Sequence, residues 1–141
     1  MIVNLRNNMI ISSHPQTAIS LYMRTRGMIG RKFDLDSLDG MVFERCASIH
    51  TCFMSIPLDV IFTDKNNIVT KVISNVAPWR LAFGAKSSYK VIELPVGVIE
   101  KTKTLVGDVL QINSILDKEK VSKKTTLSKS LTANNQAVTM K

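Results

Sequence analysis

The chain has 141 residues, 45% of them hydrophobic, and a formal net charge of +8 at pH 7. This length fits one domain, and two cysteines are too few for the disulfide framework of a small secreted protein. The N-terminal segment MIVNLRNNMIISSH lacks the apolar core of a signal peptide, and no run approaches the ~18 apolar residues of a membrane span. We therefore expect a soluble, cytoplasmic protein with reduced thiols.

Half of the net positive charge lies in the C-terminal residues 117–141. Residues 117–141 contain six lysines and two acidic residues, so they carry +4, and residues 1–116 carry the other +4. We predict that residues 1–116 form a single β-rich domain and that residues 117–141 form a disordered Lys/Ser/Thr-rich tail. A basic tail is also compatible with binding to nucleic acid or to an anionic surface.

The first expected elements are a hairpin and a helix. Residues 1–5 and 9–12 are short apolar runs, and the two Asn residues between them tolerate the positive φ of a tight turn. Ser13 and Gln16 then fit a capping box, and apolar residues recur at helical spacing up to Gly27. This pattern predicts a helix from the capping box to Gly27, where glycine ends it.

After a polar loop over residues 30–40, the pattern becomes typical of β structure. Short apolar runs separated by turns predict strands at 41–44, 50–54, 58–63, 68–76, 88–94 and 109–113. A short helical turn is expected within residues 95–103. Several connections are too short for a helical crossover, which favours antiparallel pairing. We predict a mainly β (α+β) fold: a small antiparallel sandwich or barrel-like domain of about seven strands with one packed helix.

Five motifs, in this order, resemble one protein family. They are RTRGMIGRK (24–32), DGMVFERCASIHTCFMSIPLDVIFTD (39–64), PWRL (78–81), VIELPVG (91–97) and VGDVL (106–110). The chain is similar to the family known as domain of unknown function 192, over about residues 1–113. The resemblance implies a mainly β domain with one helix, and it implies no reaction, catalytic residue or cofactor. Some members are encoded near pilus or secretion genes, which implies a protein partner of that kind as one alternative.

Two carboxylates stand in apolar predicted strands. Strand alternation places Asp59 on one face of residues 58–63 and Glu93 on one face of residues 88–94. A buried carboxylate is costly unless it is paired, and His50 and several arginines are the available partners. We therefore predict a polar cleft. Its candidate members are Arg24, His50, Asp59, Trp79, Arg80 and Glu93.

Three interpretations of this cluster remain open. It could be a structural ion-pair network that fixes the helix and loops to the sheet, a pocket for a small ligand, or an acid/base site in which His50 works near neutral pH. We interpret the chain as an accessory or ligand-binding domain for a small ligand or a protein partner, with no established reaction. The alternative is a hydrolase-like enzyme that uses His50 with a carboxylate.

The sequence does not favour a metal site or a nucleic-acid-binding loop. Cys46, His50 and Cys52 supply only three of the four ligands of a structural zinc site, and nothing places His14 beside them. We expect no metal and no cofactor. The segment GMIGRK resembles the phosphate-clamping loop of KH domains, but no second helix is predicted after it.

Overall fold

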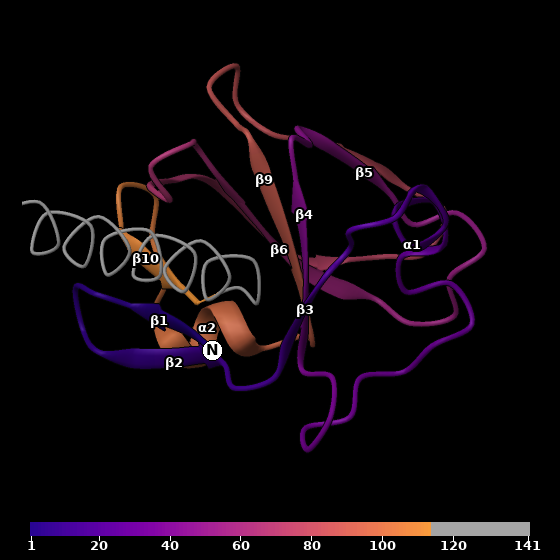
Figure 1. The fold of residues 1–141 in the computed structure, drawn as a ribbon, viewed down its shortest axis with the longest axis horizontal. Coiled ribbons are helices and arrows are strands. Elements are labelled where there is room, and N and C mark those ends of the chain that lie inside the picture. The colour runs from indigo at the N-terminus through magenta and orange to yellow at the C-terminus, as the bar shows by residue number, and fades with distance from the viewer. Residues whose placement is uncertain (114–141) are drawn as a thin grey trace, which may run out of the picture.

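The computed structural model describes residues 1–113, which contain ten strands and two short helices (Figure 1). The predicted tail, residues 117–141, lies outside the described residues. The strands are β1 (Ile2–Asn4), β2 (Met9–Ser12), β3 (Pro15–Thr17), β4 (Gly40–Glu44), β5 (Ser48–His50), β6 (Leu58–Thr63), β7 (Val69–Val76), β8 (Leu81–Phe83), β9 (Lys90–Leu94) and β10 (Leu110–Ile112). The helices are α1 (Leu21–Arg26) and α2 (Val98–Thr102).

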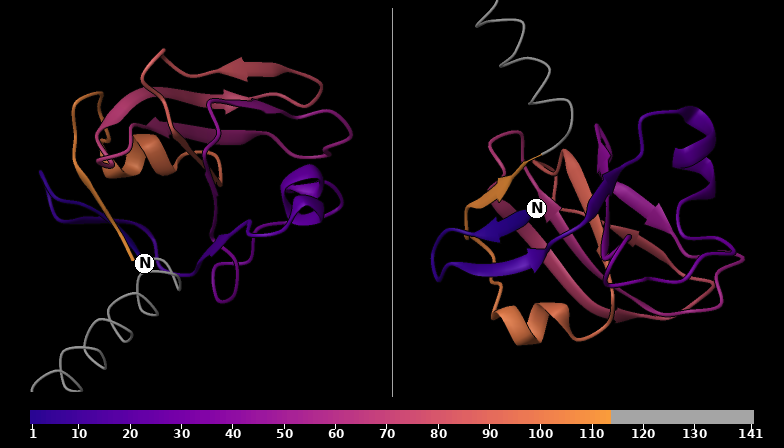
Figure 2. Two further views of the ribbon diagram at one scale, coloured as in Figure 1. Left: turned by 45° about the horizontal axis from the view of Figure 1, so that its top comes forward. Right: turned by 60° about the horizontal axis from the view of Figure 1, so that its bottom comes forward.

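A five-stranded sheet of order β3-β4-β9-β6-β7 forms the centre of the domain. All of its neighbouring strands pair antiparallel except β3 and β4, which are parallel. The sheet β10-β1-β2 and helix α2 lie on one side of it, and helix α1 and the sheet β5-β8 lie on the other (Figures 1 and 2). The predicted mainly β fold is confirmed.

Strand alternation gives the central sheet two apolar faces. β6 is buried along its whole length because both of its faces are covered. The core on the α1 side, which we call the α1-side core, includes Met28, Phe43, Leu58, Val60, Phe62 and Val91. The core on the other side, the α2-side core, includes Ile2, Ile61, Ile92, Leu94, Ile99 and Leu110.

The strands do not close into a barrel, because the central sheet is open with β3 and β7 at its edges. The count of about seven strands was too low. β3 and β8 have three residues each and no apolar run long enough to predict them. The second helical segment, expected as a turn, is α2.

The predicted start of the first helix is wrong, although its end at Gly27 is correct. The side chain of Asp39 accepts hydrogen bonds from the backbone N–H groups of Ser13 and His14, at 2.6 and 2.8 Å. The chain then continues as β3 beside β4. The helix begins only after Ser20, whose hydroxyl caps Met23 N–H at 3.1 Å. Tertiary pairing therefore overrides the local capping signal.

No helix within residues 1–113 is both long and apolar enough to cross a membrane.

Candidate functional site

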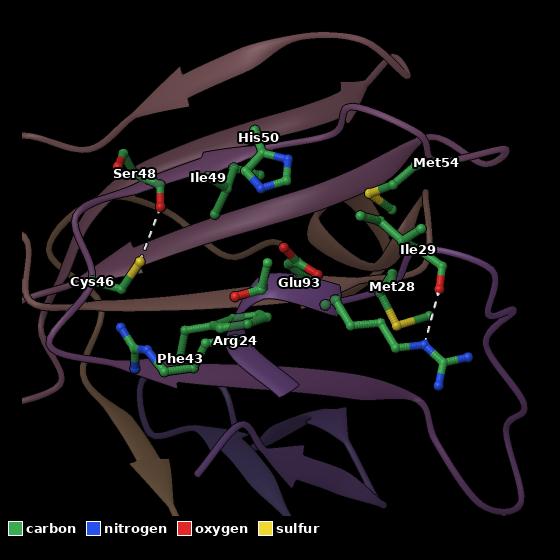
Figure 3. A pocket seen from close by; sticks show the side chains of 13 residues that line it. Arg24, Met28, Ile29, Phe43, Cys46, Ser48, Ile49, His50, Met54 and Glu93 are labelled. Atoms are coloured by element: carbon green, nitrogen blue, oxygen red, sulfur yellow. Dashed lines mark hydrogen bonds between the residues drawn. The ribbon is translucent and has the colours of Figure 1, made fainter. Parts of the chain in front are cut away.

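A pocket of about 70 Å³ opens between α1 and the central sheet (Figure 3). Residues from Arg24 to Ile29, in α1 and the turn after it, form one wall. The central sheet contributes Phe43 and Glu93, and the segment around β5 contributes Ile49 and His50. The lining is therefore mostly apolar, with a few charged groups.

Glu93 is the buried acid of this pocket. Its side chain is only 4% exposed, because alternation along β9 turns it toward the α1-side core. Its Oε2 atom has no hydrogen-bond partner among residues 1–113. Burial disfavours the charged form and raises the pKa of Glu93 to about 8. At neutral pH this carboxyl group is therefore mainly protonated.

Gly27 leaves space beside this carboxyl group. It ends α1 with a φ of +48°, and its N–H donates to Met23 O at 2.8 Å. A Cβ atom at this position would lie 3.8 Å from Glu93 Oε2 and 3.6 Å from the ring of Phe43. The same glycine thus terminates the helix and keeps the wall over Glu93 free of a side chain.

Two arginines line the pocket, and neither has a carboxylate partner within residues 1–113. Arg24 donates to the backbone oxygen of Glu44 at 2.6 Å, and Arg26 donates to the backbone oxygen of Ile29 at 3.4 Å. Neither arginine forms an ion pair with a carboxylate of residues 1–113. Backbone carbonyls therefore hold both side chains in place, and their charges stay uncompensated in the described part of the chain.

His50 completes the polar part of the lining. It lies at the end of β5 and is exposed. Figure 3 shows its ring across the pocket from Glu93, whose carboxyl group points toward that side. The thiol of Cys46, also in the lining, donates to the backbone oxygen of Ser48 at 2.9 Å. The arrangement combines a buried acid of raised pKa with two arginines and an imidazole.

Asp59 does not belong to this pocket. In the β6–β9 pairing, Asp59 is opposite Leu94 while Glu93 is opposite Val60. This one-residue offset puts the two carboxylates on opposite faces of the same sheet. Asp59 is fully buried on the α2 side, where it accepts three backbone N–H bonds. The donors are Asn75, Gly97 and Ile99, at 3.0, 3.0 and 2.9 Å.

Trp79 and Arg80 do not line the pocket either. Trp79 is 58% exposed and packs edge-to-face on Phe53, with ring centroids 4.7 Å apart. The backbone N–H of Arg80 donates to the hydroxyl of Thr51 at 2.9 Å. Of the six predicted cleft residues, the structure brings together Arg24, His50 and Glu93, and it separates Asp59, Trp79 and Arg80 from them.

Sequence reasoning did not identify the segment from Gly27 to Ile29 as a wall of the pocket. The signal for it was a glycine directly after a helix that carries two arginines, in RTRGMIG. The metal candidates are also separated, because Cys46 and His50 line the pocket and Cys52 does not. Residues 1–113 contain no group of three or more His, Cys, Asp or Glu side chains that could hold a metal ion.

Comparison with known proteins identifies the family. The model of DUF192, described as "Uncharacterized ACR, COG1430", matches residues 4–112. The chain belongs to this family. The resemblance indicated by the five motifs is thereby confirmed, since all of them lie within the matched residues.

The DUF192 chain is similar to archaeal proteins of the same group. It is 32% identical to a UPF0127 protein of Pyrococcus horikoshii over 113 residues, which cover 79% of this chain and 97% of that protein. It is 40% identical to a UPF0127 protein of Pyrococcus abyssi over 65 residues, which span 46% of this chain and only 55% of that relative.

The fold is shared with a protein of unknown function from Novosphingobium aromaticivorans. The TM-score is 0.62 at 23% identity, and the match covers 70% of this chain and 74% of that structure. The names of these three proteins specify no ligand or reaction.

Proposed function

We propose that this DUF192 domain binds a small molecule in the pocket beside Glu93. The observation that carries the proposal is the Oε2 atom of Glu93, which is buried, lacks a partner within residues 1–113 and adjoins a cavity. Leaving a buried polar group unsatisfied costs about 1–3 kcal/mol. A ligand that hydrogen-bonds to this atom would offset that cost.

The contrast with the other buried carboxylates supports this proposal. Asp39, Asp59 and Asp108 are all buried, and each accepts at least three hydrogen bonds from neighbouring segments. These three carboxylates have structural partners that explain their burial. Glu93 lies in a strand whose backbone is fully paired in the sheet, so its side chain is not needed to satisfy the local backbone.

The test is a titration of the labelled full-length chain followed by amide chemical shifts. Three probes of similar size are used: propionate, propionamide and propylammonium. We expect at least one of them to move the amide signals of Gly27, Ile49 and Glu93, and not those around Asp108. The variant Glu100→Gln, which alters an exposed glutamate on α2, is the matched control and should respond as the parent does. Unmoved signals with all three probes would overturn the proposal.

An acid/base function is the second candidate. It is favoured by one observation, namely that His50 and the mainly protonated Glu93 line the same pocket. Such a pair could move a proton to and from a bound substrate. Turnover of a small ester that disappears in His50→Ala, with an unchanged melting temperature, would support this function. Absence of turnover by the folded parent chain counts against it.

We also propose that this domain is cytoplasmic. Cys46 and Cys52 are both free thiols, and such thiols stay reduced in that compartment. Binding of nucleic acid or an anionic surface by residues 117–141 is a separate proposal, supported only by their charge of +4.

A further inference from the structure

We propose that the ligand of this pocket is a short-chain monocarboxylate, whose carboxylate accepts a hydrogen bond from Glu93 and lies among Arg24, Arg26 and His50. This inference rests on the proposed function, because it assigns a chemical class to the molecule bound beside Glu93.

The charges around the pocket favour an anion. The charged and titratable groups in the lining are Arg24 and Arg26 from α1, Cys46 and His50 from the segment around β5, and Glu93 from β9. Both guanidinium groups lack an ion-pair partner within residues 1–113. With Glu93 protonated, the lining has a net positive charge at neutral pH. A cationic ligand would be repelled, whereas a carboxylate would be attracted.

The hydrogen bond with Glu93 requires a proton between the two carboxyl groups. Two carboxyl groups that share a hydrogen bond repel each other when both are ionised, so one of them keeps its proton. Burial already raises the pKa of Glu93 to about 8, so Glu93 holds this proton in the free protein. Its O–H can donate to the ligand carboxylate in a charge-assisted bond, which is among the stronger hydrogen bonds in proteins.

Size and wall chemistry limit the rest of the ligand. A cavity of about 70 Å³ accepts a molecule of only a few heavy atoms. The walls beyond the charged groups are Met28, Phe43, Ile49 and Met54, which suit an alkyl group. A second carboxylate on the ligand would face this apolar wall and would be costly to bury. Acids of about two to four carbons fit these limits.

The test measures the affinity of propionate, propionamide and propylammonium from pH 6 to 9.5. We expect propionate to bind most tightly. Above the pKa of Glu93 in the free protein, about 8, its affinity should fall about tenfold per pH unit until the pKa in the complex is reached, because the free protein loses the shared proton. Glu93→Gln keeps a neutral N–H donor in the same place. In this variant, propionate should still bind, and the loss of affinity above pH 8 should disappear.

The control variant Glu100→Gln should keep the pH dependence of the parent. Stronger binding of propylammonium, increasing with pH, would overturn the assigned ligand class while leaving the proposed function intact. An unchanged pH profile in Glu93→Gln would overturn the role of Glu93 in holding the proton. Failure of all three probes to bind at any pH would overturn both proposals, since the pocket would then have no small-molecule ligand.

Discussion

At the scale of single residues, two buried carboxylates on neighbouring strands have opposite roles. Asp59 on β6 and Glu93 on β9 are separated by a register offset of one residue, so they point to opposite faces of the sheet. On its face, Asp59 meets three backbone N–H donors. On the other face, Glu93 meets a cavity. A sequence pattern that marks both as buried acids cannot by itself distinguish these roles.

The stability of the protein should therefore depend on the ionisation of Glu93. Its folded-state pKa of about 8 lies above the ordinary value of 4.5, so between these values the folded chain holds a proton that the unfolded chain has lost. As far as Glu93 is concerned, the free energy of unfolding is therefore highest below pH 4.5, where the folded and the unfolded chain both hold the proton. It decreases as the pH rises toward 8, by at most about 1.4 kcal/mol per pH unit.

We expect Glu93→Gln to remove this decrease, because glutamine is neutral at every pH. Urea unfolding of the two proteins at several pH values between 5 and 8 measures the slopes. The variant should gain stability relative to the parent as the pH rises, and the two should be closest near pH 5. Parallel slopes in both proteins would show that Glu93 is ionised or paired in the folded state. Glu100→Gln should follow the parent throughout.

At the scale of elements, helix α2 depends on a side chain from another strand. Its N-cap residue is Gly97, which has no side chain to satisfy the first N–H groups. Asp59 of β6 supplies the missing acceptor, since one of its oxygens accepts from both Gly97 and Ile99. Its other oxygen fixes the backbone of β7 at Asn75. One carboxylate thus connects a helix and two strands.

Replacing Asp59 with Asn should therefore destabilise the fold without affecting the pocket. An amide keeps one acceptor oxygen but brings an N–H group toward backbone donors, so we expect a loss of about 2–3 kcal/mol in the free energy of unfolding. Urea unfolding at pH 7 measures this loss, and the amide shifts of Gly27 and Ile49 should stay unchanged. Glu93→Gln is the matched comparison on the opposite face, and it should not be destabilising at that pH. Equal losses in the two variants would contradict the assigned roles.

The elements that could be predicted from sequence are those with a strong local pattern. β6 was predicted with its observed bounds, because LDVIFT is a run of apolar and β-branched residues ended by a turn. The hairpin of β1 and β2 and the end of α1 at Gly27 were also signalled locally. β3 could not be predicted, since its strand character comes from pairing with β4 and from Asp39, which lies far along the chain.

The candidate site was predictable in part for the same reason. Alternation correctly turned Glu93 and Val91 to one face, and the structure places Glu93 in a pocket with Arg24 and His50. The prediction that Asp59 joins them was wrong, because the face on which Asp59 lies relative to Glu93 depends on the register of β6 and β9, which no local pattern contains. The position of Trp79 likewise depends on its loop, where it packs on Phe53 at the surface.

At the scale of the whole molecule, long-range polar contacts hold the ends of the domain together. Asp108, shortly before β10, accepts hydrogen bonds from Asn4 at 2.6 Å and from Arg6 at 2.6 Å. The Arg6 guanidinium beside it holds the pKa of Asp108 well below its usual range, at about 2. These contacts close the N-terminal hairpin onto the last strand. The sheets and the pocket described here are built from residues within 1–113.

This organisation allows the pocket and the basic tail to be tested separately. Deleting residues 117–141 removes half of the net charge, from +8 to +4, and no pocket residue. If the tail binds nucleic acid, the full chain should bind double-stranded DNA weakly at about 50 mM salt and lose most of that binding at about 200 mM, because counterion release drives it. The truncated chain should show little binding at either salt concentration in fluorescence anisotropy.

Both chains should respond alike to propionate, since its contacts lie between residues 24 and 93. DNA binding that survives the deletion unchanged would exclude the tail as its source. The basic surface of residues 1–116, which also carries +4, would then have to account for it.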